Sequence, residues 1–252
     1  MTHVLIPLAL ITTLFGAMFA LIAAGRRLGA GRKGDGLAAI DGAVFGLMGL
    51  LIAFTFGSAA VRFETRRNLI VEEANDIGTA YLRLDLLPAD AQPPLREAFR
   101  RYVDVRLEVY RKITDLDATK AELARMAKLQ QQIWAGSVAG CRQVDSPAPC
   151  MLLLAALNDM IDITTTRTVA FQTHQPAVVF LMLALVMLAC SLLAGFGMGA
   201  GEGRGSRIHA ICFAVVLALA FYVILDLEYP RIGLIRVDWM DRVLEDVRHG
   251  MR

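Results

Sequence analysis

The chain has 252 residues, of which 56% are hydrophobic and 20% are charged, and its formal net charge is +2. Soluble globular proteins are less apolar, and about a quarter of their residues are charged. The near-neutral balance gives no reason to expect nucleic acid as a partner, whereas the mean hydropathy of +0.51 indicates a membrane protein.

Four apolar runs are long enough to cross a bilayer, because a spanning helix needs about 20 residues. They cover residues 4–24, 37–61, 177–200 and 208–225. No basic residue precedes the first run, and it is longer than the apolar part of a signal peptide, so we expect it to be retained. Short connections join the first run to the second and the third to the fourth, which predicts two hairpins. The second run is rich in glycine and alanine, and such residues let helices approach closely in lipid, so we expect a homo-oligomer.

The polar segment between the second and third runs is predicted to be helical. Pro93 and Pro94 open a helix, since proline is tolerated in the first turn. Apolar residues on this helix recur at steps of three and four: Leu95, Ala98, Tyr102, Val105 and Val109. Its opposite face is charged, as expected of a solvated surface. Two further helices are predicted near residues 118–134 and 150–172, and a short amphipathic one near 239–252.

The predicted fold is therefore an all-α membrane protein, with four transmembrane helices in two hairpins and a helical polar domain between the second and third. The expected divisions are 1–62 for the first two transmembrane helices, 63–175 for the polar domain, 176–226 for the last two helices and 227–252 for a turn and tail.

No catalytic, cofactor or metal site is predicted. The chain has no glycine-rich phosphate loop, nucleophile elbow or metalloprotease helix. Its four histidines do not pair at ligand spacing. Asp159 and Asp162 share a helical turn, but two carboxylates without further oxygen ligands favour an exposed or capping role. Glu72 and Glu73 are adjacent, so they do not face each other on a helix.

The four cysteines fall into two kinds. Cys190 and Cys212 lie within apolar runs, where cysteine behaves as a small hydrophobe. Cys141 and Cys150 flank residues 142–149 in the polar segment. A disulfide between them suits an oxidising compartment and two free thiols suit a reducing one, and the sequence leaves both open. No second pair or nearby histidine completes a zinc site.

One stripe of the second apolar run suggests a pore. Gly46, Leu50 and Phe54 recur every four residues, and Ser58 extends the stripe. Such a stripe can face the central axis of an oligomer, or it can be ordinary helix packing. A straight helix would continue beyond this run into the polar domain.

The end of the second run resembles the bestrophin family of pentameric ion channels. The matching residues are Phe54, Ser58, Ala59, Arg62, Phe63, Arg67, Leu69, Glu72 and Asn75. Residues 71–88, 157–162 and 226–235 resemble a bacterial bestrophin-like family of unknown function. The chain departs from bestrophins after the neck phenylalanine, where they usually carry asparagine. It also lacks a counterpart of the acidic clamp of the animal proteins, so calcium gating is not expected.

The resemblance implies an oligomeric ion channel, most simply a pentamer, that sits in the lipid bilayer of a bacterial inner membrane and conducts small inorganic ions. The second transmembrane helix would line the pore through Gly46, Leu50, Phe54 and Ser58. Charges at the pore mouth would come from Arg62, Arg66, Arg67 and Glu72. The alternative is a non-conducting membrane scaffold or sensor whose polar domain binds a partner.

Two arguments about orientation conflict. Basic residues in short loops favour the cytosolic side. The first loop contains Arg26, Arg27, Arg32 and Lys33, and the other short loop contains Arg204 and Arg207. This pattern predicts a polar domain outside the cell, which would suit a disulfide. Bestrophins place the corresponding domain in the cytosol. We follow the charge pattern, because the resemblance concerns the fold rather than the topology.

Overall fold

The computed structural model describes residues 2–30, 38–112, 116–199, 204–230, 234–235 and 237–251. Every regular element within these ranges is helical, which confirms the predicted all-α class. The α-helices are α1 (Thr2–Gly29), α2 (Ala38–Leu82), α3 (Gln92–Arg111), α4 (Leu116–Cys141), α5 (Pro147–Gln172), α6 (Ala177–Met198), α7 (Arg204–Glu228) and α8 (Arg242–Gly250). Two short 3-10 helices are η1 (Arg83–Leu86) and η2 (Asp238–Asp241). Arg32 and Lys33, which enter the orientation argument, lie outside the described residues, and so do residues 231–233 of the tail.

The chain divides into two compact units. Met1–Glu64 and His174–Arg236 form the first, here called the membrane unit, and Thr65–Thr173 and Val237–Arg252 form the second, the polar unit. Four stretches are long and apolar enough to cross a membrane, and they fall in α1, α2, the α5–α6 region and α7. The chain is therefore an integral membrane protein with the predicted number of candidate spans.

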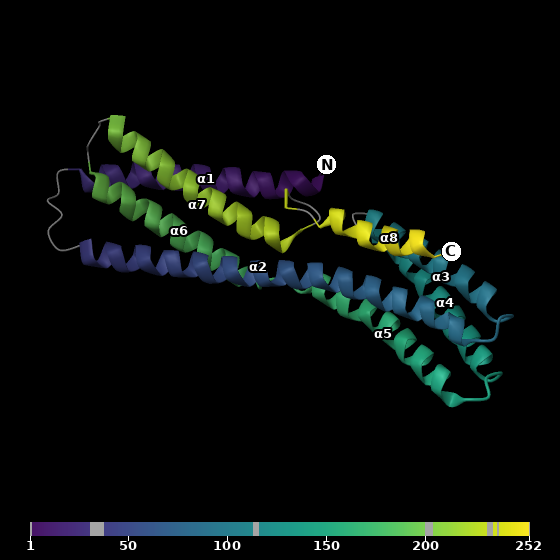
Figure 1. Ribbon diagram of the computed structural model, residues 1–252. Helices are drawn as coiled ribbons and strands as arrows, with labels where there is room; N and C mark the ends of the chain where they lie inside the picture. The colour runs from purple at the N-terminus through teal and green to yellow at the C-terminus, as the bar shows by residue number, and fades with distance from the viewer. Residues whose placement is uncertain are drawn as a thin grey trace. The chain divides into compact units, whose positions relative to one another are not determined.

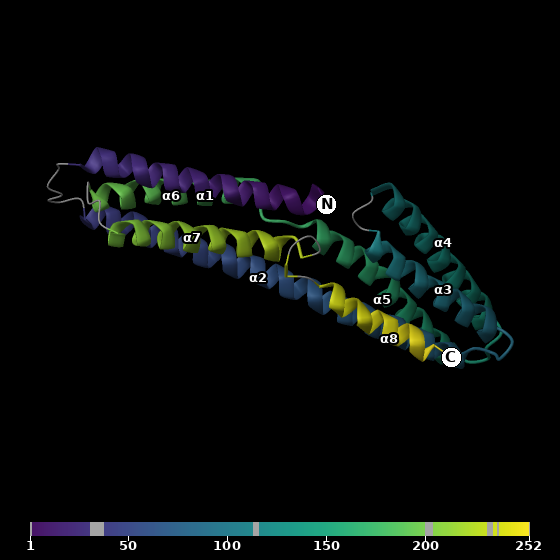
Figure 2. The same cartoon turned by 90° about the horizontal axis from the view of Figure 1, so that it is seen from above.

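In the membrane unit, α1, α6, α7 and the first part of α2 run side by side (Figures 1 and 2). The buried core includes Met18, Ile22, Leu183, Met187 and Phe221. Helix α1 packs most extensively against α6. Glycines make this close approach possible, because a Cβ on Gly25 would overlap the carbonyl oxygen of Leu192, and one on Gly195 would overlap that of Ile22.

Helix α2 is the longest element, with 45 residues. It joins the second apolar run to the polar domain without a break, as the sequence predicted. Its most apolar window is only 17% buried within the single chain, compared with 22%, 22% and 33% for the other three candidate spans. More of α2 than of any other candidate span is thus left for lipid or another subunit to cover.

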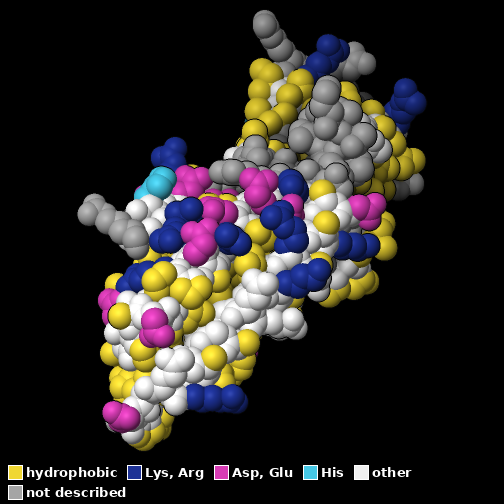
Figure 3. Space-filling view, turned by 90° about the vertical axis from the view of Figure 1, so that its right-hand side faces the viewer, with side chains coloured by type: hydrophobic (Ala, Val, Ile, Leu, Met, Phe, Trp, Pro, Cys, Tyr) yellow, Lys and Arg dark blue, Asp and Glu magenta, His cyan; other side chains and the backbone are white. Residues whose placement is uncertain are grey.

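In the polar unit, α3 packs against α4, and α5 packs against α4 and η1. Proline stands in the first turn of both α3 and α5, where its missing N–H has no intrahelical partner to lose. Aromatic and aliphatic side chains from several helices fill the core, among them Ile77, Phe99, Tyr102, Ile133 and Leu157. Basic and acidic side chains intermix on the face shown in Figure 3, as expected of a solvated surface.

Candidate functional site

The outward face of α2 in the membrane unit is apolar, and the other described residues leave it uncovered. Leu50 is 51% exposed and Phe54 is 65% exposed. A Cβ at Gly46 would meet open space. Ser58 is half-buried at the edge of this face. The stripe predicted to line a pore therefore faces away from the chain's own core at three of its four positions.

The opposite face of α2 packs within the membrane unit. Met48 and Ala59 belong to its buried core. Thr55 is also buried, and its hydroxyl donates to the carbonyl oxygen of Leu51 at 2.6 Å. Because the hydroxyl proton is used within the helix, Thr55 does not donate it to a partner helix.

Arg62, the first predicted pore-mouth charge, is held by an acidic residue of α7. Its Nε atom donates to both carboxylate oxygens of Glu228, at 3.1 and 3.0 Å. Its Nη2 atom donates to Oε1 of Gln175 at 2.6 Å. Glu228 is fully buried and also accepts the backbone N–H of Gln175 at 2.7 Å. The charge of Arg62 is thus balanced inside the membrane unit.

The other three predicted pore-mouth charges lie in the polar unit and differ in their surroundings. Arg66 is buried and donates to the carbonyl oxygens of Ala170 and Thr173, at 3.1 and 2.7 Å, at the end of α5. The guanidinium of Arg67 lies over the ring of Trp239, 5.6 Å from its centroid. Glu72 is exposed. The roles of all four at a pore mouth remain predictions.

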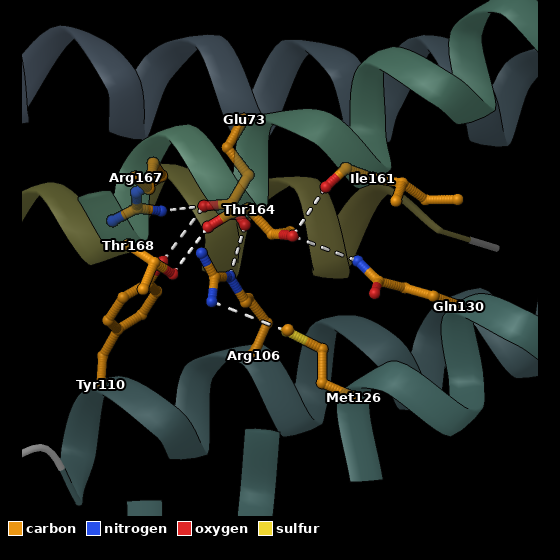
Figure 4. Close-up of polar contacts among 9 residues, drawn as sticks. All are labelled: Glu73, Arg106, Tyr110, Met126, Gln130, Ile161, Thr164, Arg167 and Thr168. Carbon is orange, nitrogen blue, oxygen red and sulfur yellow. Dashed lines mark hydrogen bonds and ion pairs between the residues drawn. The ribbon is translucent and has the colours of Figure 1, made fainter. Parts of the chain in front are cut away.

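A buried ionic cluster in the polar unit was missed in the sequence (Figure 4). Glu73 is fully buried, and its carboxylate accepts hydrogen bonds from Nε of Arg106 and Nη1 of Arg167. The hydroxyl of Tyr110 donates to the same carboxylate at 3.1 Å. Both guanidinium groups also lie over the Tyr110 ring, 4.9 and 4.5 Å from its centroid. The cluster ties α2, α3 and α5 together through charge-assisted hydrogen bonds.

The sequence did carry a signal for this cluster. Glu73 is four residues from both Leu69 and Ile77, so it interrupts the buried stripe of α2. Arg106 likewise lies four residues after the buried Tyr102 on the apolar face of α3. A charge inside an apolar stripe calls for a partner of opposite sign, because an isolated buried charge is costly.

Asp76, outside the Glu73 cluster, is a partly buried carboxylate of the polar unit. Burial raises the pKa of Asp76 above its usual value, and the carboxylates of Asp159 and Glu72 raise this pKa further. Across the part of the chain that the structure describes, no three His, Cys, Asp or Glu residues come together as a metal site.

Asp226 fixes the start of the tail within the membrane unit. It is buried, and its carboxylate accepts the backbone N–H groups of Leu234 at 2.9 Å and Ile235 at 2.7 Å. These two hydrogen bonds explain how an acidic residue can be buried directly after an apolar run.

The cysteine pair lies between α4 and α5. The structure joins Cys141 to Cys150, with their Cα atoms 5.6 Å apart, within the range that disulfides require. Cys190 is buried and Cys212 is exposed.

The fold defines a class, the all-α integral membrane proteins with four candidate spans. A single-substitution variant of a bacterial bestrophin homologue from Klebsiella pneumoniae aligns with a TM-score of 0.74 over 97% of each chain at 15% identity. The homologue solved by Zn-SAD phasing gives 0.73 over 96% of this chain and 97% of that chain at 14% identity. No curated protein matches the sequence. The Bestrophin-like domain model matches residues 12–239, so the chain belongs to the Bestrophin-like family.

Proposed function

We propose that this protein is an oligomeric ion channel whose second transmembrane helix lines the pore. The observation that carries the proposal is the outward face of α2, where Leu50 and Phe54 are 51% and 65% exposed in the single chain. The longest helix therefore turns its apolar stripe away from the core. In an assembly around a central axis, this stripe supplies the pore wall.

The chemistry of the stripe suits a gate rather than a binding site. Rings of Phe54 and Leu50 side chains would form an apolar constriction, which can close by dewetting because an ion does not shed its water cheaply there. Gly46 has no side chain, so the pore would widen at that level. The bestrophin resemblance supports a pentamer and small inorganic ions as the conducted species.

The proposed location is the bacterial inner membrane, with the polar unit on the outer side. Arg26 and Arg27 in the last turn of α1 support cytosolic placement of that end of the membrane unit. The Cys141–Cys150 pairing supports an oxidising environment for the polar unit. This orientation is opposite to the one that the bestrophin resemblance implies.

Ion flux from proteoliposomes tests the pore. The variant Leu50→Ala/Phe54→Ala widens the constriction, so flux should rise or ion selectivity should change. The matched control is Leu185→Ala/Leu219→Ala, which truncates apolar side chains of α6 and α7 with similar exposure, 57% and 58%. The control should leave flux unchanged.

Native mass spectrometry of both variants establishes whether the oligomer is intact. Unchanged flux in an intact Leu50→Ala/Phe54→Ala oligomer would remove α2 from the conduction path. A protein that never conducts would favour the alternative, a membrane scaffold whose polar unit binds a partner.

A further inference from the structure

Three polar side chains of the membrane unit hold α2 at one level, and they are here called the Arg62 clamp. Arg62 lies on α2, Gln175 lies in the connection between α5 and α6, and Glu228 is the last residue of α7. The Nε atom of Arg62 donates to both carboxylate oxygens of Glu228, at 3.1 and 3.0 Å. Its Nη2 atom donates to Glu228 at 2.9 Å and to Gln175 at 2.6 Å. Because several donors of one guanidinium fix its plane as well as its position, the clamp restrains the rotation of α2 about its own axis.

The acceptor side of the Arg62 clamp is itself fixed. The backbone N–H of Gln175 donates to Oε1 of Glu228 at 2.7 Å. Directly beside these two residues, the rings of His174 and Tyr229 stack with their centroids 4.7 Å apart. Glu228 is fully buried, and a hydrogen bond is stronger where water is excluded. The connection before α6 and the end of α7 therefore present the carboxylate to α2 in one orientation.

Other contacts restrain the membrane part of α2 less. A Cβ at Gly46, Gly49 or Gly57 would meet open space, so these glycines do not press against a neighbouring helix. The most apolar window of α2 is only 17% buried. Apolar packing on the buried side consists of many weak contacts without a preferred direction, whereas hydrogen bonds weaken steeply when they are misaligned. The Arg62 clamp therefore supplies a directional restraint that the packing does not.

A rotation of α2 at the clamp would carry over to the apolar stripe. The helix has no break between Phe54 and Arg62, which are eight residues or about 12 Å apart along the axis. Successive residues of an α-helix differ by about 100° in direction. Phe54 is accordingly 65% exposed, whereas Thr55, the next residue, is 5% exposed. A rotation of that size would replace an apolar side chain with a hydroxyl on the outward face.

We propose that Arg62, Gln175 and Glu228 are positioning residues for the pore, because their clamp sets the rotation of α2 that turns Phe54 outward and keeps Thr55 in the core. Loss of the clamp frees α2 to rotate and changes which side chains form the constriction. The effect on ion flow rests on the proposed channel function. The orientation of α2 does not, so it is measured separately.

Alkylation of single cysteines measures the orientation of α2. The background is Cys190→Ala/Cys212→Ala, which leaves only the disulfide-paired cysteines of the polar unit in protein isolated without reductant. Either Phe54→Cys or Thr55→Cys is added to this background. The rate of reaction with N-ethylmaleimide in detergent is followed by intact-protein mass. With the clamp present, position 54 should react faster than position 55.

The variant Arg62→Met/Glu228→Gln removes the clamp. It leaves no buried charge without a partner, so it should fold. The ratio of the two alkylation rates should fall by on the order of tenfold, within the range usual for energetic coupling between two positions. Gln175→Leu removes the 2.6 Å hydrogen bond and keeps the ion pair, so it should lower the ratio less. This milder variant carries the test if the double variant does not fold.

The matched control is Arg248→Met/Asp104→Asn, which removes an ion pair of the polar unit with two hydrogen bonds of 2.8 and 3.1 Å. It should leave the alkylation ratio unchanged. Circular dichroism and native mass spectrometry verify that each variant is folded and that its oligomer is intact.

Ion flux from proteoliposomes, measured on the same variants, separates the clamp from the channel function. A lower ratio together with changed flux or ion selectivity supports both proposals. A lower ratio with unchanged flux supports the clamp and removes α2 from the conduction path. An unchanged ratio in folded protein of both clamp variants, or an equal fall in the control, would overturn the clamp.

Discussion

Replacing Glu73 with alanine removes the carboxylate that accepts hydrogen bonds from Arg106, Arg167 and Tyr110. Both arginines are nearly fully buried, so water cannot substitute for the lost acceptor. Removing one partner of a buried ion pair costs about 3–5 kcal/mol. Since one carboxylate serves two guanidinium groups here, we expect a loss of about 5 kcal/mol, on the order of several thousandfold in the unfolded population.

Urea denaturation in detergent, followed by tryptophan fluorescence, measures this loss. Both tryptophans, Trp134 and Trp239, lie in the polar unit, so their emission reports on the unit that contains the cluster. The matched control is Glu72→Ala, because Glu72 is the adjacent residue and is exposed. Its effect should stay within about 0.5 kcal/mol. Equal shifts for the two variants would refute the view that the buried carboxylate holds α2, α3 and α5 together.

Three further predictions concern packing, titration and redox state. Gly25→Ala should lower the thermal unfolding midpoint in detergent, since its Cβ would meet the backbone of α6, whereas Gly16→Ala, whose Cβ meets open space, should not. Asp76→Asn should stabilise the protein against urea at pH 7. The pKa of Asp76 is higher in the folded state than in the unfolded state, so folding destabilises the ionised carboxylate, which asparagine removes. The gain in stability should vanish below pH 3.8, the ordinary pKa of this side chain, and a gain that does not depend on pH would contradict the prediction. Cys141 and Cys150 should resist alkylation without reductant in protein isolated with thiols blocked; full alkylation of both would count against the outer placement of the polar unit.

The helices could be predicted from sequence because their signals are local. Residues 4–24 and 208–225 are apolar runs without Asp, Glu, Lys or Arg, and they lie within the longer helices α1 and α7. Proline marked the start of α3, and the helix predicted near 150–172 begins slightly earlier, at Pro147. The boundary near residue 134 was wrong, because α4 continues to Cys141. Gly136 and Gly140 weaken the helix propensity of this end, and their close approach to Leu95 and Leu87 shows that packing supports the helix there.

Partners in the candidate site were harder to predict because they lie far apart in the chain. The stripe of Leu50 and Phe54 is visible as a period on one helix. The pairing of Arg62 with Glu228 spans 166 positions, and neither local segment contains a signal that identifies the other residue as its partner. Glu73 was rejected as a ligand paired with Glu72, because neighbouring residues on a helix point in different directions. That same geometry places one of them in the core and the other in solvent.

The pairing of Arg62 changes what the proposed pore is able to do. A ring of unpaired arginines would raise the local anion concentration through its positive potential. Here Glu228 is fully buried and shares a salt bridge of 2.9 Å with Arg62, so the two charges largely cancel at any distance beyond the pair itself. Arg62 then fixes the middle of α2 against α7 and contributes little to the field in a pore. Any preference for one sign of ion has to arise from other residues, and the apolar stripe of α2 is left to control whether ions pass at all.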